Sequence, residues 1–270
     1  MAPTPVPAGD WSPRNKWTHA RSYVGFLPAN FAHRARLARL RALLRRLDLP
    51  DEGQLVDLGC SDGFILSELR RHGDIPAMWS LAGYDKRKRL VRMARRRALP
   101  ATRFGLRDLN NPKARVHDPG TVVICLETLE HVGDYRAALR VIHAALLPGG
   151  YLILSMPNEV GVIGLIKLLG RPLTRRSPYR GFFTGTRQFV RYTIAVARHR
   201  DLEPFRWPPR LGWGPHLGFD HRAVMRHLQS EFVDTGLWTV DRVERSAFGA
   251  NQFLVARRAV TSGAGEGAPD

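Results

Sequence analysis

The chain has 270 residues, 44% of them hydrophobic, and a formal net charge of +18 at pH 7; this length suits one large domain or one domain with an insertion. Two cysteines, Cys60 and Cys125, are too few for a disulfide scaffold and argue against a zinc site. No apolar run reaches the ~20 residues that span a bilayer, and residues 1–10 lack a signal-peptide pattern, so we expect a globular protein of the reducing cytoplasm.

The first 53 residues are expected to form an N-terminal arm and an amphipathic helix. Aromatic residues and prolines are frequent in 11–32, a composition typical of an irregular segment. From 33 to 47, leucines recur at helical spacing between arginines. Pro50 and Gly53 then end the predicted helix.

Strands and helices alternate through 54–158, which we expect to be a ligand-binding core. Such alternation builds a parallel sheet with helices on both faces, and ligands bind at the carboxyl ends of its strands. The predicted strands are 54–58, 80–84, 102–106, 121–126 and 151–155, and the predicted helices are 62–71, 86–98 and 135–147.

The alternation breaks in 159–218 and resumes in 219–258. A short connection between the last two predicted strands implies an antiparallel hairpin. The final residues, 259–270, are rich in glycine and alanine, so we expect a disordered tail. The predicted elements of 219–258 are a helix at 220–232 and strands at 239–247 and 252–257.

A glycine turn follows the first predicted strand and indicates a ligand site. Gly59 and Gly63 let the backbone turn sharply and approach a ligand without a Cβ, and the amides at the start of the next helix face the same space. The closer Gly-x-Gly-x-x-Gly spacing that a dinucleotide pyrophosphate needs is absent. The candidate binding residues of this strand and turn are Asp57, Gly59, Cys60, Ser61 and Gly63.

Acidic residues after the next two strands add to this site. Asp85, with Lys86 beside it, can accept both hydroxyls of a ribose. Asp85 is equally well interpreted as the cap of the following helix. After the third strand, Asp108 could accept an adenine amino group and Leu109 could pack on the ring.

The chain resembles class I S-adenosylmethionine-dependent methyltransferases in the motifs VDLGCSDGFILSEL, LAGYDKRKRLVRMA and TVVICLETLEHVGDYRAALRVIHAALLPGGYLILSMPN and in the terminal hairpin. The resemblance covers roughly 54–157 and 216–258 and is strongest to the small-molecule group that includes the ubiquinone-biosynthesis O-methyltransferases. It implies an α/β fold with a Rossmann-like, doubly wound, seven-stranded sheet whose last strand is antiparallel, and S-adenosyl-L-methionine as methyl donor. Ser61 replaces a glycine that is more common in the family, and serine is small enough for binding to survive.

The segment after the fourth strand, 127–132, is expected to lie over the methyl group. Glu127 could orient the cofactor or the acceptor, and His131 could take a proton from an acceptor hydroxyl. Alternatively, the segment is a structural cap in which His131 holds a loop by hydrogen bonds. Because methyl transfer from a sulfonium is an in-line displacement that proximity can drive, a base is optional.

A second catalytic candidate is His216, because a histidine near this place in the family often faces the acceptor. Nearby, Asp220 is a candidate cap for the last helix. The histidines are scattered and show no metal-binding spacing, so we expect no metal centre.

Residues 159–218 replace a short connection and are expected to form the acceptor side. An apolar run followed by a basic aromatic stretch, together 160–183, is typical of a peripheral contact with an anionic membrane. Such a contact, at the inner face of the membrane, would give access to a lipid-linked acceptor. A lid over the substrate pocket is an equal alternative, because ten apolar residues can also form ordinary core.

The sequence therefore predicts a methyltransferase that acts on a small-molecule or lipid-linked acceptor, at a hydroxyl. A nucleic-acid (RNA) methyltransferase is an alternative, suggested by the basic stretches 34–46 and 86–97. Only five of the 42 basic residues are lysine, so much of the charge is compositional background, and no clear device for clamping a flipped base is present. A non-catalytic binding protein of the same fold is a further alternative.

Overall fold

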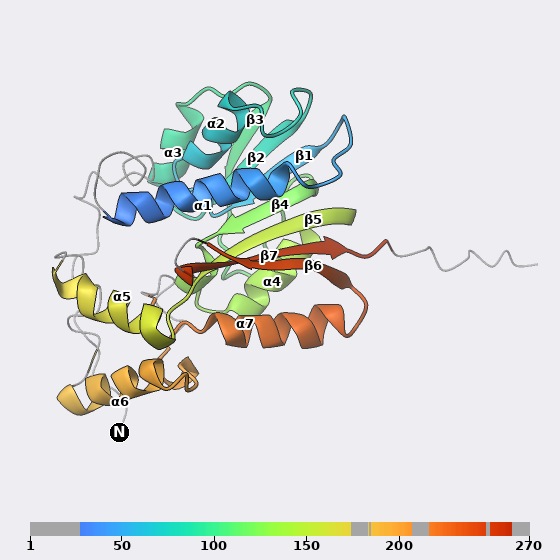
Figure 1. The fold of residues 1–270 in the computed structure, drawn as a ribbon. Coiled ribbons are helices and arrows are strands. Elements are labelled where there is room, and N and C mark those ends of the chain that lie inside the picture. The colour runs from blue at the N-terminus through green and yellow to red at the C-terminus, as the bar shows by residue number, and fades with distance from the viewer. Residues whose placement is uncertain (1–27, 174–182, 184, 207–215, 247–248, 261–270) are drawn as a thin grey trace, which may run out of the picture.

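The computed structural model of the chain describes residues 28–173, 183, 185–206, 216–246 and 249–260. The arm expected before residue 28, most of the basic aromatic stretch after residue 173 and the tail after residue 260 lie outside these residues. Figure 1 shows one sheet with helices on both sides and two further helices, α5 and α6, below it.

Seven strands form the sheet in the order β3-β2-β1-β4-β5-β7-β6. Neighbours from β3 to β5 are parallel, whereas β7 is antiparallel to both β5 and β6. The expected doubly wound sheet with an antiparallel last strand is thereby confirmed. The strands are β1 Gln54–Leu58, β2 Ser80–Asp85, β3 Thr102–Leu106, β4 Gly120–Leu126, β5 Leu146–Pro157, β6 Trp238–Arg245 and β7 Asn251–Arg258.

β5 exceeds its predicted length by far more than any other strand. β5 begins at Leu146 rather than at Tyr151, so the proline and two glycines at 148–150, between the predicted helix and the predicted strand, lie within the strand. Opposite them, the pairing of β4 with β5 shifts register between Gly120 and Val122. The proline and glycines are therefore absorbed by an irregularity in the sheet instead of ending the strand.

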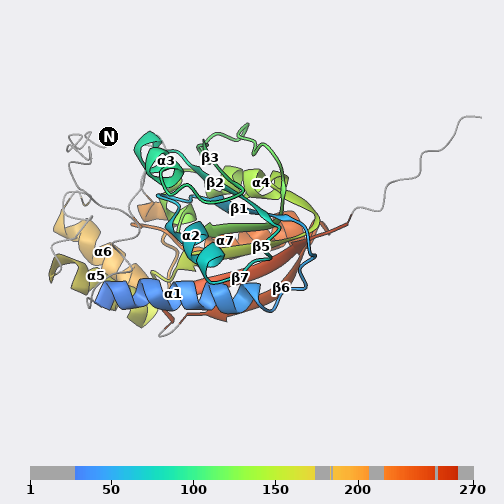
Figure 2. The ribbon, with the colours of Figure 1, turned by 90° about the horizontal axis from the view of Figure 1, so that it is seen from above.

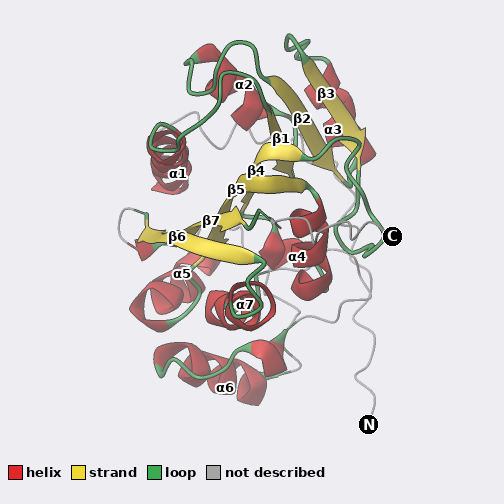
Figure 3. Cartoon of the chain, turned by 90° about the vertical axis from the view of Figure 1, so that its right-hand side faces the viewer, coloured by secondary structure: helices red, strands yellow, loops and turns green. Residues whose placement is uncertain are grey.

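Helices cover both faces of the sheet (Figure 3). On one face, α1, α2 and α3 contribute leucines and a valine such as Leu40, Leu66 and Val91 to a buried cluster. On the other face, α4 and α7 contribute Leu139 and Val224. These helices are α1 Pro28–Leu44, α2 Phe64–Arg71, α3 Lys88–Arg95, α4 Tyr135–Ala144 and α7 His221–Leu228, which a π-helical turn, Gln229–Val233, extends.

The N-terminal helix α1 begins earlier than predicted, at Pro28 rather than at residue 33. Proline suits a first helical position because its missing N–H would have no partner there and its φ is already helical. The helix ends at Leu44, and its last turn tightens: the Leu47 amide donates to the Leu44 carbonyl at 3.1 Å. The predicted end at 47 was therefore one irregular turn too late.

The segment 159–218 contains two helices, α5 (Gly161–Leu173) and α6 (Thr186–Ala197), and a short 3₁₀ turn, Glu203–Phe205. They share a small core of their own that includes Leu168 and Tyr192. Gly164 lets the helices approach closely, because a Cβ there would lie 2.8 Å from the Val196 side chain. Figures 1 and 2 place both helices beyond the carboxyl ends of the parallel strands. Among the described helices, none has the length and apolar content needed to cross a membrane.

Candidate functional site

The turn after β1 has a backbone that side chains rarely tolerate. Gly59 and Gly63 have φ angles of 92° and 72°, and a Cβ on Gly59 would collide with the Thr128 side chain. Ser61 between them also has a positive φ of 53°. A glycine is the natural residue for such a conformation, which gives a physical reason for the glycine that Ser61 replaces.

Asp85 ties this turn to the end of β2. Its Oδ2 accepts the Ser61 amide at 3.1 Å and its Oδ1 accepts the Arg87 amide at 2.8 Å. The side chain does not cap α3 itself, which begins at Lys88 without a side-chain cap. A carboxylate has about four acceptor sites, so Asp85 keeps capacity for hydroxyl donors of a ligand.

Two buried side chains lie at the turn: Asp57 belongs to β1, and Cys60 belongs to the turn itself. Burial, with a smaller contribution from the Asp85 charge, raises the pKa of Asp57 to about 8. Burial also raises the pKa of the Cys60 thiol well above its usual value, so this cysteine stays protonated and unreactive. Cys60 lies two residues beyond the end of β1.

The residues predicted for the adenine end differ in burial. Asp108 is exposed, and its Oδ1 accepts the backbone amide of Asn110 at 3.0 Å and its side-chain amide at 2.6 Å. Leu109 is buried in the core cluster that contains Tyr84. Burial lowers the pKa of Lys86, opposed by the charge of Asp108. The structure thus brings Lys86 and Asp108 near each other, while Asp108 already accepts hydrogen bonds within its own turn.

Glu127 follows β4 directly and has a positive φ of 48°. Its Oε1 accepts the Ser155 hydroxyl at 3.1 Å, and its Oε2 lies 3.5 Å from Arg36 Nη1. The ion pair is largely buried, with side-chain exposures of 6% for Arg36 and 14% for Glu127. A guanidinium at this edge is a candidate partner for a ligand carboxylate.

Sequence reasoning missed Arg36, which looked like one of six arginines on the solvated face of a helix. Its position in the helical repeat could have identified it, because Arg36 precedes Leu40, Leu43 and Leu44 by four, seven and eight residues. Those spacings place it on the same helix face as these leucines, which pack against the sheet.

The segment Leu129–His131 is a 3₁₀ turn that a residue of the insertion holds in place. Arg206, at the far end of the insertion, donates through Nη2 to the carbonyls of Glu130 at 2.9 Å and Val132 at 2.8 Å. Glu130 itself has an exposed fraction of 0%, and neither carboxyl oxygen has a hydrogen-bond partner in the described part of the chain. Burial, and then the Glu127 charge, raise the pKa of Glu130 well above its usual value.

His131 and His216 meet above this turn. Their rings stack edge to face, with centroids 4.8 Å apart. Nε2 of His216 lies 4.0 Å from Glu130 Oε1, and its Nδ1 lies 3.2 Å from Glu159 Oε1. The two histidines predicted as catalytic candidates, one from the core and one from the end of the insertion, therefore lie together.

The sequence predicted no metal centre, yet the fold assembles a group that could hold an ion. Glu130, His131 and His216 each offer one ligand atom, and these atoms lie within 4.8 Å of one another. Two imidazoles and a carboxylate suit a first-row divalent ion. The spacing along the chain gives no sign of this group, because His216 comes from the end of the insertion, far from Glu130 and His131 in the sequence.

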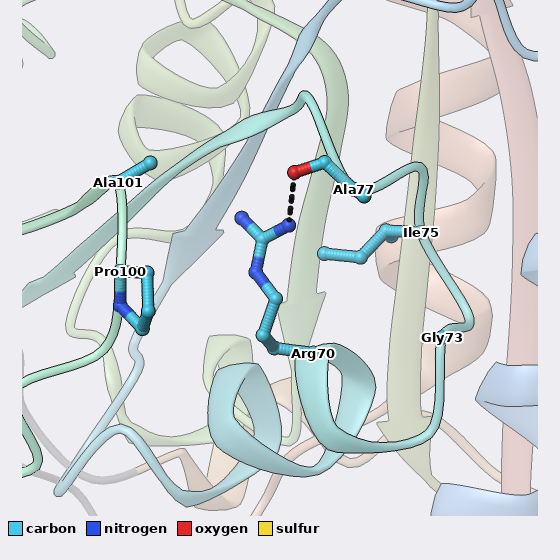
Figure 4. Close-up of a pocket in the computed structure, with 6 residues that line it drawn as sticks. All are labelled: Arg70, Gly73, Ile75, Ala77, Pro100 and Ala101. Atoms are coloured by element: carbon cyan, nitrogen blue, oxygen red, sulfur yellow. Dashed lines mark hydrogen bonds between the residues drawn. The ribbon is translucent and has the colours of Figure 1, made fainter.

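A small pocket at the other end of the sheet is not a second site (Figure 4). It measures about 170 Å³ and is lined by Ile75, Ala77, Pro100 and Ala101 around Arg70, which is below the range of about 300–1,000 Å³ that is typical of ligand pockets. The Arg70 guanidinium donates to the backbone carbonyls of Ala77 at 2.9 Å and Trp79 at 2.6 Å. These hydrogen bonds of the Arg70 guanidinium therefore stabilise the fold.

Comparison with known proteins adds independent observations. Residues 31–199 match a family profile described as a methyltransferase domain. A ubiquinone biosynthesis O-methyltransferase of Xanthomonas oryzae pv. oryzae is 27% identical over 170 residues, which cover 62% of this chain and 66% of that protein. The match thus spans just under two thirds of the relative's length.

Two solved structures share the fold at lower sequence identity. Magnesium protoporphyrin IX methyltransferase from Synechocystis PCC 6803, with bound SAH, has a TM-score of 0.52 and 17% identity, covering 89% of this chain and 92% of that one. An S-adenosylmethionine dependent methyltransferase from Mesorhizobium loti has a TM-score of 0.51 and 18% identity, covering 83% and 98%. Both likenesses concern the fold alone.

Proposed function

Because the chain belongs to the S-adenosylmethionine-dependent methyltransferase family, we propose that it transfers the methyl group to a hydroxyl of a small-molecule or lipid-linked acceptor. The proposal rests on one observation, the contact between His131 and His216. Their ring centroids lie 4.8 Å apart, at the same edge of the sheet as the glycine turn. One histidine belongs to the donor core and the other to the insertion that borders it.

The donor half fits the cofactor. The positive φ angles of Gly59 and Gly63 let the chain turn sharply above β1, and the buried Ser61 hydroxyl has no hydrogen-bond partner in the described residues. Asp85 would accept the ribose hydroxyls, and Arg36 would pair with the methionyl carboxylate. When bound, the cofactor supplies an electrophilic methyl group on a sulfonium.

The remaining predicted donor residues have supporting roles in this proposal. Glu127 adds negative charge near a cationic ligand, Asp57 keeps its proton beneath the turn, and Lys86, Asp108 and Leu109 border the adenine end. Cys60 contributes only its small buried side chain.

On the acceptor half, His216 Nε2 or His131 takes the hydroxyl proton. The acceptor oxygen then forms its bond to the methyl carbon as the carbon–sulfur bond breaks, and the bond electrons leave with sulfur. Such proton acceptance contributes typically ~10²–10⁴-fold in rate, while alignment of oxygen and methyl carbon supplies the rest.

The test measures donor binding and transfer separately. We expect titration calorimetry to show S-adenosylmethionine binding to the wild-type protein, and labelled methyl groups to appear on catechol or on a dodecyl catechol held in vesicles. H216N should bind the donor normally and transfer slowly. No donor binding by pure protein, or transfer only to RNA, would contradict the proposal.

The surface of the insertion supports a lipid-linked acceptor. Three side chains of α5, Val162, Ile166 and Leu169, are 71%, 63% and 60% exposed and recur at i, i+4 and i+7, so they lie along one stripe. An apolar stripe beside cations is what binds the interface of an anionic membrane. On α6, the exposed apolar residues are Phe189, Val190 and Ile194 and the exposed arginines are Arg187 and Arg191.

Sedimentation with phosphatidylcholine vesicles, with and without phosphatidylglycerol, tests this contact. The wild type should sediment with the anionic vesicles, and I166D should not. M78D, which changes an apolar side chain 77% exposed elsewhere on the surface, is the matched control. Equal sedimentation of I166D and M78D would instead favour the lid.

A further inference from the structure

Glu159 is a buried acid that the donor site does not use. It follows β5 and precedes α5, and its side chain is 2% exposed. Its Oε1 lies 3.2 Å from His216 Nδ1 and 3.5 Å from Lys167 Nζ. A buried carboxylate is retained at low cost only when such partners hold it.

The loop that carries Glu159 is itself fixed. Lys167 Nζ donates to the carbonyls of Asn158 at 2.9 Å and Ala250 at 2.8 Å, and the Asn158 amide donates to Ala250 at 2.9 Å. The first turns of α5 and the β6–β7 turn therefore hold Glu159 in place against His216.

This contact determines which nitrogen of His216 carries a proton. A carboxylate only accepts hydrogen bonds, so the proton of the neutral ring lies on Nδ1 and the lone pair lies on Nε2. Nε2 is the nitrogen that faces Glu130, 4.0 Å from its Oε1, and the His131 ring. Carboxylates orient functional histidines in this way whether the other nitrogen accepts a proton or binds an ion.

We infer that Glu159 is a positioning residue that fixes the tautomer and orientation of His216, so that Nε2 presents its lone pair to the acceptor side of the site. The inference rests on the role proposed above for His216.

Nitrogen-15 spectra of the histidine rings test the inference directly, with His216 assigned from the resonance that H216N lacks. In the wild-type protein we expect the neutral form of the His216 ring to carry its proton on Nδ1, and E159A should lose this preference. E159Q keeps an acceptor oxygen and should retain it in part. A wild-type His216 with its proton on Nε2 would overturn the inference without any need for a variant.

Kinetics give the second measurement, with catechol as the acceptor. E159A should lower kcat by about 10- to 100-fold, the usual effect of removing such an orienting partner, with KM for catechol and donor affinity little changed, and E159Q should recover part of the loss. E68Q is the matched control, because Glu68 is also a carboxylate beside a histidine, 3.6 Å from His72, but lies on α2.

The outcomes separate the two claims. If H216N is inactive while folded E159A keeps the wild-type tautomer and kcat, the positioning role is wrong and the proposed function stands. If H216N turns over like the wild type, the catalytic role of His216 is wrong, and Glu159 cannot act through it.

Discussion

Arg36 Nη1 and Glu127 Oε2 lie 3.5 Å apart, so the N-terminal helix touches the sheet at the point where β4 ends. We expect R36M to weaken S-adenosylmethionine binding by about 10- to 100-fold, since a hydrogen bond to a charged group contributes about 1.5–3 kcal/mol. R36K should be intermediate, because lysine lacks the planar fork. Calorimetry measures the change, with R39M as control, since Arg39 pairs with Glu244 away from the turn. Equal affinities of R36M and R39M would contradict the role of Arg36.

Asp85 links the glycine turn to β2 and is the residue that we propose accepts the ribose hydroxyls. D85A should weaken donor binding by at least about 10-fold, because the Ser61 amide and the ribose hydroxyls lose a charged acceptor together. The control is D118A, which removes an acid that is half exposed and paired with Arg103. If D85A and D118A bind the donor alike, the ribose assignment is wrong.

Ser61 occupies a left-handed conformation with φ 53°, and its buried hydroxyl has no hydrogen-bond partner in the described residues. S61G should raise the free energy of unfolding by about 0.5–1 kcal/mol, because relief of the strain outweighs the entropy that glycine adds to the unfolded chain. Urea denaturation measures this. A101G is the reference, since Ala101 has φ 48° and is exposed. A loss of stability in S61G alongside a gain in A101G would show that the serine hydroxyl stabilises the turn.

The pKa of Asp57, raised to about 8 by burial and by Asp85, predicts a pH-dependent stability. The folded protein keeps a proton on Asp57 that the unfolded chain releases near pH 4. The contribution of Asp57 to the free energy of unfolding is therefore complete below about pH 4 and is lost as pH rises through about 8. The stability of the wild type relative to D57N should therefore fall over that window, by up to about 1.4 kcal/mol per pH unit. Urea titrations from pH 5 to pH 9 measure it, with D241N, at an exposed site, as control. Parallel curves for wild type and D57N would contradict the buried, protonated state.

The sheet could be predicted because its signals are local. Continuous apolar runs such as 121–126 follow from burial on both faces, and the burial of β4 agrees with that cause. Asp220 caps α7 as predicted, accepting the Arg222 amide at 2.9 Å. In each case the pattern and the structure concern residues that are neighbours along the chain.

The proposed acceptor side could not be predicted in the same way, because its contacts join distant segments. His131 contacts His216, and Arg206 bonds the carbonyls at 130 and 132. No spacing in the sequence encodes such contacts, which arise only when α5 and α6 fold against the sheet edge. Glu159 was missed for that reason, since it borders a predicted strand but acts on a residue beyond two helices.

The edge of β5 is closed by β7, which joins it only after the chain has passed through α5, α6 and α7. Within that stretch α7 and β6 pack in the main core and the sheet, whereas α5 and α6 share a small core of their own. Because doubling the length of a flexible loop costs only ~0.6 kcal/mol of closure entropy, the part that carries α5 and α6 can be exchanged while β1 and β2 keep their register. Changes of acceptor within such a lineage are expected to arise by replacement of one contiguous stretch of gene that keeps its few anchoring side chains.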